Sequence, residues 1–164
     1  MKLAEVSLVA ATVFTSLMAG IFFAFTVSVM PGLGRLSDAG FLNAMQSINR
    51  EIQNPVFFLV FFGVLLLLPF SVYLHYHADR SVFLLLIAAT GVYFLGTFGV
   101  TVLGNVPLNN QLDSFDLARA TPDAMQSFRA HFEGKWNMLN NVRTVSNLLS
   151  AIMMICACVW SRGR

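Results

Sequence analysis

Four long stretches of this chain contain no charged side chain. They lie between Glu5 and Arg35, Glu51 and Asp79, Arg80 and Asp113, and Arg143 and Arg162. A helix needs about 20 apolar residues to cross a hydrocarbon layer about 30 Å thick. Since each stretch holds an apolar segment of about that length, the sequence predicts four membrane crossings, at about 6–30, 55–76, 81–104 and 142–160.

The composition excludes most other classes of protein. Hydrophobic residues make up 57% of the chain and charged residues 11%, against roughly 45–50% and about 25% in soluble domains. A soluble enzyme would lack the charges to cover its surface, and a net charge of +2 is too small to indicate nucleic acid binding. We therefore expect one domain, 1–164, that folds as an all-α bundle of four transmembrane helices.

Four crossings place both termini and the link 77–80 on one side of the membrane. The basic tail 160–164 begins with Trp160, a residue typical of membrane interfaces, so we expect cytoplasmic termini in the inner (plasma) membrane of a bacterium. The opposite side receives two longer loops, 31–54 and 105–141. A short amphipathic helix is predicted at 39–53, capped by Ser37 or Asp38, and another begins near Pro122 and runs past Trp136 into the fourth crossing.

Small and weakly polar residues mark helix contacts in membranes, because lipid supplies no hydrophobic drive between helices. Three stripes are expected to face the bundle interior: Thr12, Ser16 and Gly20; Thr90, Thr97, Thr101 and Asn105; and Asn140, Arg143, Asn147 and Ser150. The chain also has 16 phenylalanines, many of them near 22–25, 57–62 and 94–98. These face lipid or, if some point inward, form a flat apolar slot for a planar aromatic ligand.

Asparagines gather beside the predicted crossings. They precede the second (Asn49, Asn54), follow the third (Asn105, Asn109, Asn110) and precede the fourth (Asn137, Asn140, Asn141). The topology brings all three groups to one end of the bundle, where Arg50 and Arg143 can hold an anion. The alternative is that these asparagines cap helices and close turns, as Asn54 before Pro55 suggests.

Several of these segments resemble the anthrone oxygenase-like family. The resemblance lies in Phe-Thr-Val-Ser-Val-Met-Pro-Gly-Leu at 25–33, Met45-Gln46, Ile48-Asn49-Arg50, Asn54-Pro55, Phe98-Gly99-Val100-Thr101, Asn-Val-Pro-Leu-Asn at 105–109, and Trp136 with Asn140, Val142, Arg143 and Thr144. It covers about 18–150. Two positions depart from the family pattern, since Leu139 stands where a tryptophan is frequent and Asn141 where a histidine is frequent.

The resemblance implies a small four-helix membrane protein that oxidises a lipophilic anthrone, phenol or quinone-like molecule with dioxygen and without a cofactor. Asn105, Asn109 and Asn140 would then donate hydrogen bonds to a substrate oxyanion, with Arg143 supplying positive charge. Trp136 would stack on the ring, and Gln46, Asn49, Arg50 and Asn54 would complete the substrate site. His131 is a weak candidate for the base.

No metal site is expected, because His75 and His77 form only a surface pair and Cys156 and Cys158 point to different sides of a helix. Two other functions remain open. One is a binder or carrier of a hydrophobic aromatic molecule, and the other is an accessory subunit of a larger membrane complex. A homo-oligomer is also compatible with the sequence.

Overall fold

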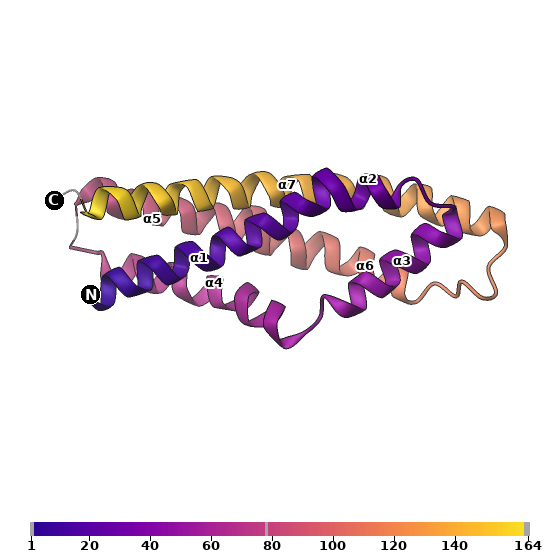
Figure 1. Cartoon of the computed structure of the whole chain (residues 1–164), viewed down its shortest axis with the longest axis horizontal. Helices are drawn as coiled ribbons and strands as arrows, with labels where there is room; N and C mark the ends of the chain where they lie inside the picture. The colour runs from indigo at the N-terminus through magenta and orange to yellow at the C-terminus, as the bar shows by residue number, and fades with distance from the viewer. Residues whose placement is uncertain (1, 78, 163–164) are drawn as a thin grey trace.

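The computed structural model describes residues 2–77 and 79–162. It is an elongated helical bundle with both termini at one end, as Figure 1 shows. The elements in chain order are α1 (Leu3–Ala24), η1 (Phe25–Val29), α2 (Met30–Leu33), α3 (Asp38–Glu51), α4 (Pro55–Leu74), α5 (Arg80–Tyr93), η2 (Phe94–Gly99), η3 (Thr101–Asn105), α6 (Val106–Asp113) and α7 (Pro122–Arg162), where η marks a π-helix.

The predicted fold class is confirmed. Four helices are long and apolar enough to cross a membrane: Leu3–Leu33, Pro55–Leu74, Arg80–Asp113 and Pro122–Ser161. Short α3 lies against the bundle, with Ser37 Oγ accepting a hydrogen bond from Gly40 N. Of the residues used to predict orientation, Ala78, Gly163 and Arg164 lie outside the described residues.

The first and third helices are longer than predicted, because two prolines do not end them. Residues 105–113 were expected in a loop, yet they continue the third helix, and the connection after it shrinks to 114–121. A proline inside a helix lacks an N–H and clashes with the carbonyl four residues earlier. Here Met30 N, just before Pro31, donates to Phe25 O, and Val106 N, just before Pro107, donates to Thr101 O. This five-residue spacing widens each helix ahead of its proline and lets it continue.

Helix α7 packs on α1 and α5, and α4 packs on the same two helices. Gly96 permits a close approach to α7, since a Cβ there would overlap the side chain of Ser146. Asn147 Nδ2 donates to Thr97 Oγ1 (3.1 Å), and Ser150 Oγ donates to Ala89 O (3.0 Å). These contacts join the third and fourth helices through small and polar side chains, as expected in lipid.

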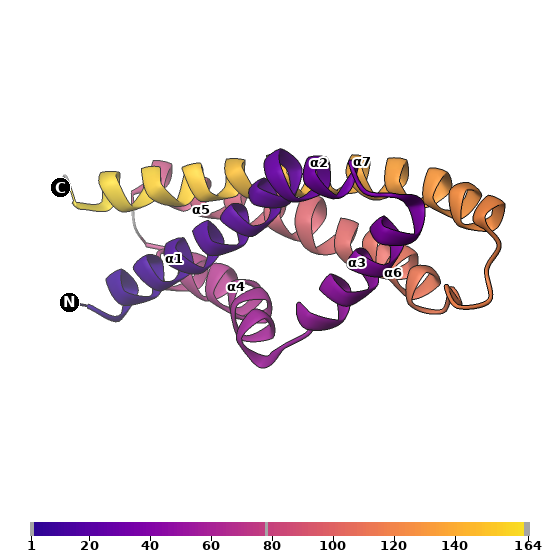
Figure 2. The same cartoon turned by 45° about the vertical axis from the view of Figure 1, so that its right-hand side comes forward.

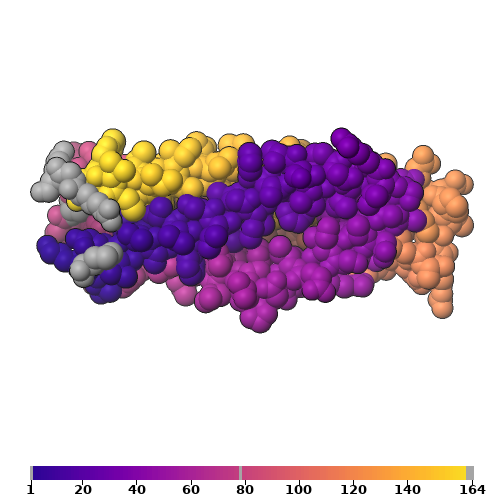
Figure 3. All heavy atoms as spheres, viewed as in Figure 1, coloured from indigo at the N-terminus to yellow at the C-terminus, as the bar shows by residue number. Residues whose placement is uncertain are grey.

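One of the three predicted stripes is wrong. Ser16 and Gly20 are exposed, and α1 instead buries Ser7, Ala11, Thr15 and Met18. Small residues occur on both faces of this helix, so helical spacing alone could not choose between them. Figure 3 shows α1 running across the face of the molecule between the C-terminal end of α7 and α4.

The end of the molecule away from the termini has its own apolar core. Helix α3 turns back toward α4 in a V-shaped junction that projects from the bundle (Figure 2). The buried side chains of α3 pack against α2, α6 and the first half of α7. Together they form a cluster of Met30, Phe41, Leu42, Met45, Leu108, Leu112, Phe132 and Trp136. This core holds the polar side chains of α3, α6 and α7 at the end of the membrane helices away from the termini.

Candidate functional site

A cavity of about 340 Å³ lies between α4 and the rest of the bundle, beneath α3. Its walls are largely aromatic, and its polar groups come from distant parts of the chain. The lining residues are Ile21, Phe22, Phe25, Ile48, Asn49, Ile52, Gln53, Phe57, Phe58, Phe61, Phe62, Phe98, Thr101, Val102, Asn105, Val106, Asn109, Asn110, Trp136, Asn140 and Arg143. Such a volume falls at the lower end of the roughly 300–1,000 Å³ typical of small-molecule sites.

Asn105 presents an unpaired amide to this cavity. The residue is 1% exposed, and neither its Nδ2 nor its Oδ1 has a hydrogen-bond partner among the described residues. It stands at the end of η3, the widened turn that precedes Pro107. A buried polar group without a partner costs about 1–3 kcal/mol, so Asn105 is suited to pair with a bound molecule.

Arg143 brings a buried positive charge to the same cavity. Its side chain donates from Nη2 to Asn140 Oδ1 (2.8 Å), and its guanidinium lies over the rings of Phe22 (4.5 Å) and Trp136 (5.4 Å). No carboxylate in the described part of the chain forms an ion pair with it, and its Nε has no partner there. Among the described residues, the charge is therefore offset by the Asn140 carbonyl and two aromatic faces and by no carboxylate, which favours an anion in the cavity.

Asn140 holds this arginine in place. Its Oδ1 accepts from Arg143, while its Nδ2 donates to Phe22 O (3.2 Å) and Thr26 Oγ1 (2.9 Å). Both amide hydrogens are thus engaged within the protein. The geometry suits Asn140 to orient the guanidinium rather than to donate to a ligand.

Trp136, Asn109 and Asn49 form the outer part of the cavity. Trp136 Nε1 donates to Asn109 Oδ1 (3.0 Å), and its ring lies beside Phe25 with centroids 5.6 Å apart. Asn49 is buried, and its Nδ2 has no partner among the residues described. Together with Asn105, Asn140 and Arg143, six of the nine residues predicted for the site line one cavity.

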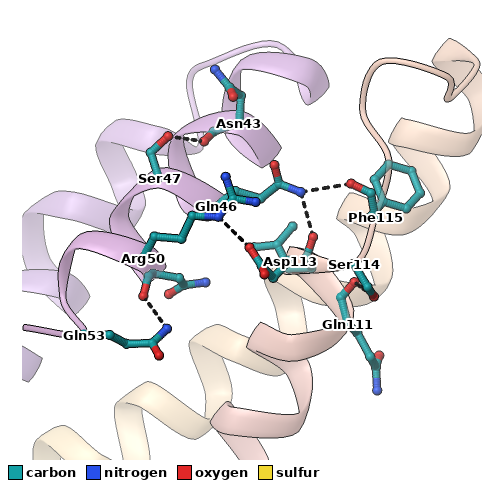
Figure 4. Close-up of polar contacts among 11 residues, drawn as sticks. Asn43, Gln46, Ser47, Arg50, Gln53, Gln111, Asp113, Ser114 and Phe115 are labelled. Carbon is teal, nitrogen blue, oxygen red and sulfur yellow. Dashed lines mark hydrogen bonds and ion pairs between the residues drawn. The ribbon is translucent and has the colours of Figure 1, made fainter.

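The other three predicted residues do not line the cavity, because their side chains connect α3 to α6 or cap α4. Gln46 Nε2 donates to Leu112 O (2.8 Å) and Phe115 O (2.9 Å), and Arg50 pairs with Asp113 (2.7 Å), as Figure 4 shows. Asn54 Oδ1 accepts from Phe57 N (3.0 Å) and caps α4. These contacts fasten α3 to α6 and start the second crossing, which is the alternative role that the sequence left open for Asn54.

The sequence also left open the direction in which the phenylalanines point. Phe57 stacks on Phe61 (5.7 Å) and Phe58 on Phe62 (5.8 Å), so the first two turns of α4 present a flat wall. Gln53 and Asn110 also line the cavity, although neither was among the nine predicted site residues. Asn110 was among the asparagines expected at this end of the bundle. For Gln53 the only available signal was its position one helical turn after Asn49.

The histidines lie away from the cavity. His131 is exposed, with its Nε2 3.2 Å from Lys135 Nζ. His75 was expected on the surface but is buried, with its Nδ1 2.8 Å from Ser71 O. Within 2–77 and 79–162, no three His, Cys, Asp or Glu side chains come together as a metal site would require.

Comparison with known proteins supports the family resemblance. The sequence model described as anthrone oxygenase matches residues 57–153, which is more than half of the chain and includes α4, the third helix and most of α7. The comparison with curated proteins and the comparison with solved structures give no match. The matched region supplies most of the cavity, including Asn105, Asn140 and Arg143. The chain belongs to the anthrone oxygenase family.

Proposed function

We propose that this protein is a membrane oxygenase that binds a planar, lipophilic anthrone or phenol as its anion and lets it react with dioxygen without a cofactor. One observation carries the proposal. An aromatic-walled cavity contains an unpaired amide, Asn105, and a buried guanidinium, Arg143, that has no carboxylate partner among the described residues. This combination suits a flat ring system that carries a negatively charged oxygen.

The chemical step starts with loss of a proton. An anthrone that loses the proton from the carbon opposite its carbonyl becomes an electron-rich enolate with its charge on oxygen. Asn105 Nδ2 donates a hydrogen bond to this oxygen, and Arg143 stabilises its charge. The apolar walls strengthen both interactions because they exclude water.

The oxidation balances with dioxygen as the only oxidant. The enolate passes one electron to dioxygen, and the resulting carbon radical and superoxide combine to form a carbon–oxygen bond. Protonation gives a hydroperoxide. Its O–O bond then breaks as the remaining hydrogen on that carbon leaves as a proton, which yields the second carbonyl and one molecule of water. Four electrons reduce dioxygen, with one oxygen atom kept in the quinone and the other released as water.

No protein base is required in this scheme. Among the described residues, none of those lining the cavity is Asp, Glu or His. The proton passes to water, and Arg143 promotes its loss because a positive charge favours the anionic form of a neighbouring group. The lack of an Asp, Glu or His in the described cavity lining also supports the second candidate, a carrier that binds the molecule without reaction. An open cavity is less consistent with an accessory subunit, whose outer end would be filled.

The proposal includes the membrane location. We place the protein in a bacterial inner membrane with both termini in the cytoplasm. Basic residues such as Lys2 and Arg80 support this orientation, because they lie near the membrane ends on the side of the termini. The cavity then opens toward the extracytoplasmic half of the bilayer.

The test measures oxygen consumption by the purified protein in lipid, with anthrone as substrate. Asn105→Leu removes the unpaired amide at nearly constant volume, and we expect turnover to fall by about 10²–10³, as when one oxyanion donor is lost. Asn43→Leu is the matched control, since Asn43 is exposed on α3 outside the cavity. Binding of anthrone without oxygen consumption by the natural protein would favour the carrier. Undiminished turnover in Asn105→Leu would refute the proposed site.

A further inference from the structure

The cavity has an opening on the side of the bundle. Four of its apolar lining residues are also exposed on the surface: Phe58 (37%) and Phe62 (48%) on α4, Val102 (43%) on η3 and Val106 (42%) on α6. Helix α4 packs on α1 and α5, and η3 and α6, which continue the same helix as α5, pack on α7. The two edges of this opening therefore belong to the second and third membrane helices.

The depth of the opening follows from the length of α4. Its 20 residues, Pro55–Leu74, extend about 30 Å at 1.5 Å per residue, which matches the hydrocarbon thickness. Phe58 and Phe62 belong to its first two turns, so they lie roughly 5–10 Å below the outer end of the helix. All four edge residues are apolar. The opening consequently faces lipid tails of the leaflet on the side away from the termini.

The cavity also has a polar rim. Gln53, between the end of α3 and the start of α4, and Asn110 on α6 both line the cavity and are exposed. Asn105 is 1% exposed and can be reached only through the cavity. A molecule with fused aromatic rings dissolves in the bilayer far better than in water, because each square ångström of apolar surface favours transfer by about 25 cal/mol.

We propose that the substrate enters sideways from the outer leaflet, through a portal between Phe58 and Phe62 on one edge and Val102 and Val106 on the other. The inference rests on the proposed function for the identity of the substrate, a planar lipophilic phenol dissolved in the membrane. The stacked rings of Phe58 and Phe62 (5.8 Å) form a flat edge, and Val102 is a stiff, β-branched residue opposite it. The portal thus admits flat molecules, and the polar rim exchanges water and protons.

Binding can be followed without turnover. The chain has two tryptophans, of which Trp136 lines the cavity and Trp160 is exposed near the end of α7. Trp160→Phe leaves Trp136 as the only indole, and quenching of its fluorescence by anthraquinone reports occupancy. The protein is placed in phosphatidylcholine vesicles, and association and dissociation rates are measured at constant total anthraquinone while lipid is added.

Narrowing the portal slows passage in both directions. Val102→Phe is expected to reduce the association and dissociation rates together by about tenfold, a barrier increase of about 1.4 kcal/mol, so Kd changes much less than either rate. Phe58→Ala widens the portal and raises both rates. Leu103→Phe is the matched control, because Leu103 is 83% exposed and does not line the cavity. In the protein without a portal substitution, we expect the observed association rate of anthraquinone to fall as added lipid dilutes it within the bilayer.

Three results would overturn the portal. One is Val102→Phe and Phe58→Ala both behaving like Leu103→Phe. Another is a weaker Kd in Val102→Phe with an unchanged association rate, which makes Val102 only a wall of the site. The third is an association rate that follows aqueous quinone and ignores lipid dilution. Failure of the proposed function is distinct, since the protein would then consume no oxygen with anthrone, whatever the binding rates.

Discussion

Arg143 combines burial, positive charge and the absence of an ion pair with any described carboxylate. Aromatic rings on two sides and the carbonyl of Asn140 restrain its position. Burying a charge without an ion-pair partner is costly, so we expect such a charge where it interacts with a ligand. The chemistry proposed for the cavity depends most on this residue.

Removing the charge should change the pH dependence of turnover. Arg143 favours the anionic substrate, so the bound substrate loses its proton at a lower pH than it does in water. In Arg143→Gln the rising limb of the rate should move to higher pH by about 1–3 units, the usual effect of one close opposite charge. Steady-state oxygen consumption, measured over a pH range that spans the ionisation of the substrate in both proteins, gives the shift.

Arg143→Lys provides the control for this measurement. It keeps the positive charge but loses the planar group that bonds to Asn140. The midpoint should stay near that of the natural protein even where the maximal rate falls. A pH profile that is the same in Arg143→Gln would mean that the charge does not act on substrate ionisation.

At the scale of the elements, prolines and glycines set the geometry around the cavity. Pro31 and Pro107 each follow a π-helical turn, and these turns carry Phe25, Thr26 and Asn105. Gly96, in η2, lets the third helix approach α7, and the hydrogen bond from Asn147 to Thr97 lies one residue along from it. Close backbone approach is a usual means of helix association in lipid.

Gly96→Ala should destabilise the bundle. The added Cβ would overlap both Cβ and Oγ of Ser146, so rotation of the serine cannot relieve the clash, and such overpacking costs about 1–3 kcal/mol. Gly91→Ala is the control in the same helix, because no atom of a neighbouring group lies within 4 Å of its added Cβ. It should keep or raise stability, by up to about 1 kcal/mol.

Thermal unfolding in a mild detergent, followed by circular dichroism, compares these two variants. An equal midpoint for Gly96→Ala and Gly91→Ala would show that the third and fourth helices tolerate a wider separation.

At the scale of the whole molecule, the protein has a membrane bundle and an outer section. The outer section consists of α3, α6 and the first half of α7, and it covers the cavity at the end away from the termini. The two sections have separate apolar cores. Arg129 on α7 ties the chain between α2 and α3 to the outer section. Its guanidinium donates to Gly34 O (2.9 Å), Leu36 O (2.8 Å) and Asp38 (3.0 Å), and to Glu133 (2.8 Å), and it lies over the ring of Phe41.

Arg129→Gln should loosen the outer section and leave the membrane bundle intact. The loss of one hydrogen bond to a charged group costs roughly 1.5–3 kcal/mol, so amides of 34–42 should exchange hydrogen faster by about ten- to a hundredfold. Arg35→Gln is the control, since Arg35 lies in the same turn and is exposed. Hydrogen exchange with mass spectrometry measures both. Equal exchange in the two variants would contradict the role of Arg129.

Much of the candidate site could be predicted, though only as a set of residues. Asn49, Asn105, Asn109, Trp136, Asn140 and Arg143 were predicted for the site, and all six line the cavity. Gln46 and Arg50 were grouped with Asn49, yet α3 turns them toward α6 while Asn49 faces the cavity. Neighbours on a helix point about 100° apart, so the partner of each depends on how the helix is rotated in the fold.

The sequence by itself determined the class of protein and the number of crossings. Whether a segment can cross a bilayer depends on its own length and charge, and these can be read without knowledge of the tertiary structure. It also located the polar groups at one end of the bundle. Only the tertiary structure decided that Asn105 is left unpaired, that Asn140 holds Arg143, and that the phenylalanines of α4 form a wall with an opening to lipid. Those features depend on helix rotation and on the π-helical turns before Pro31 and Pro107, which arise from packing between segments far apart in the chain.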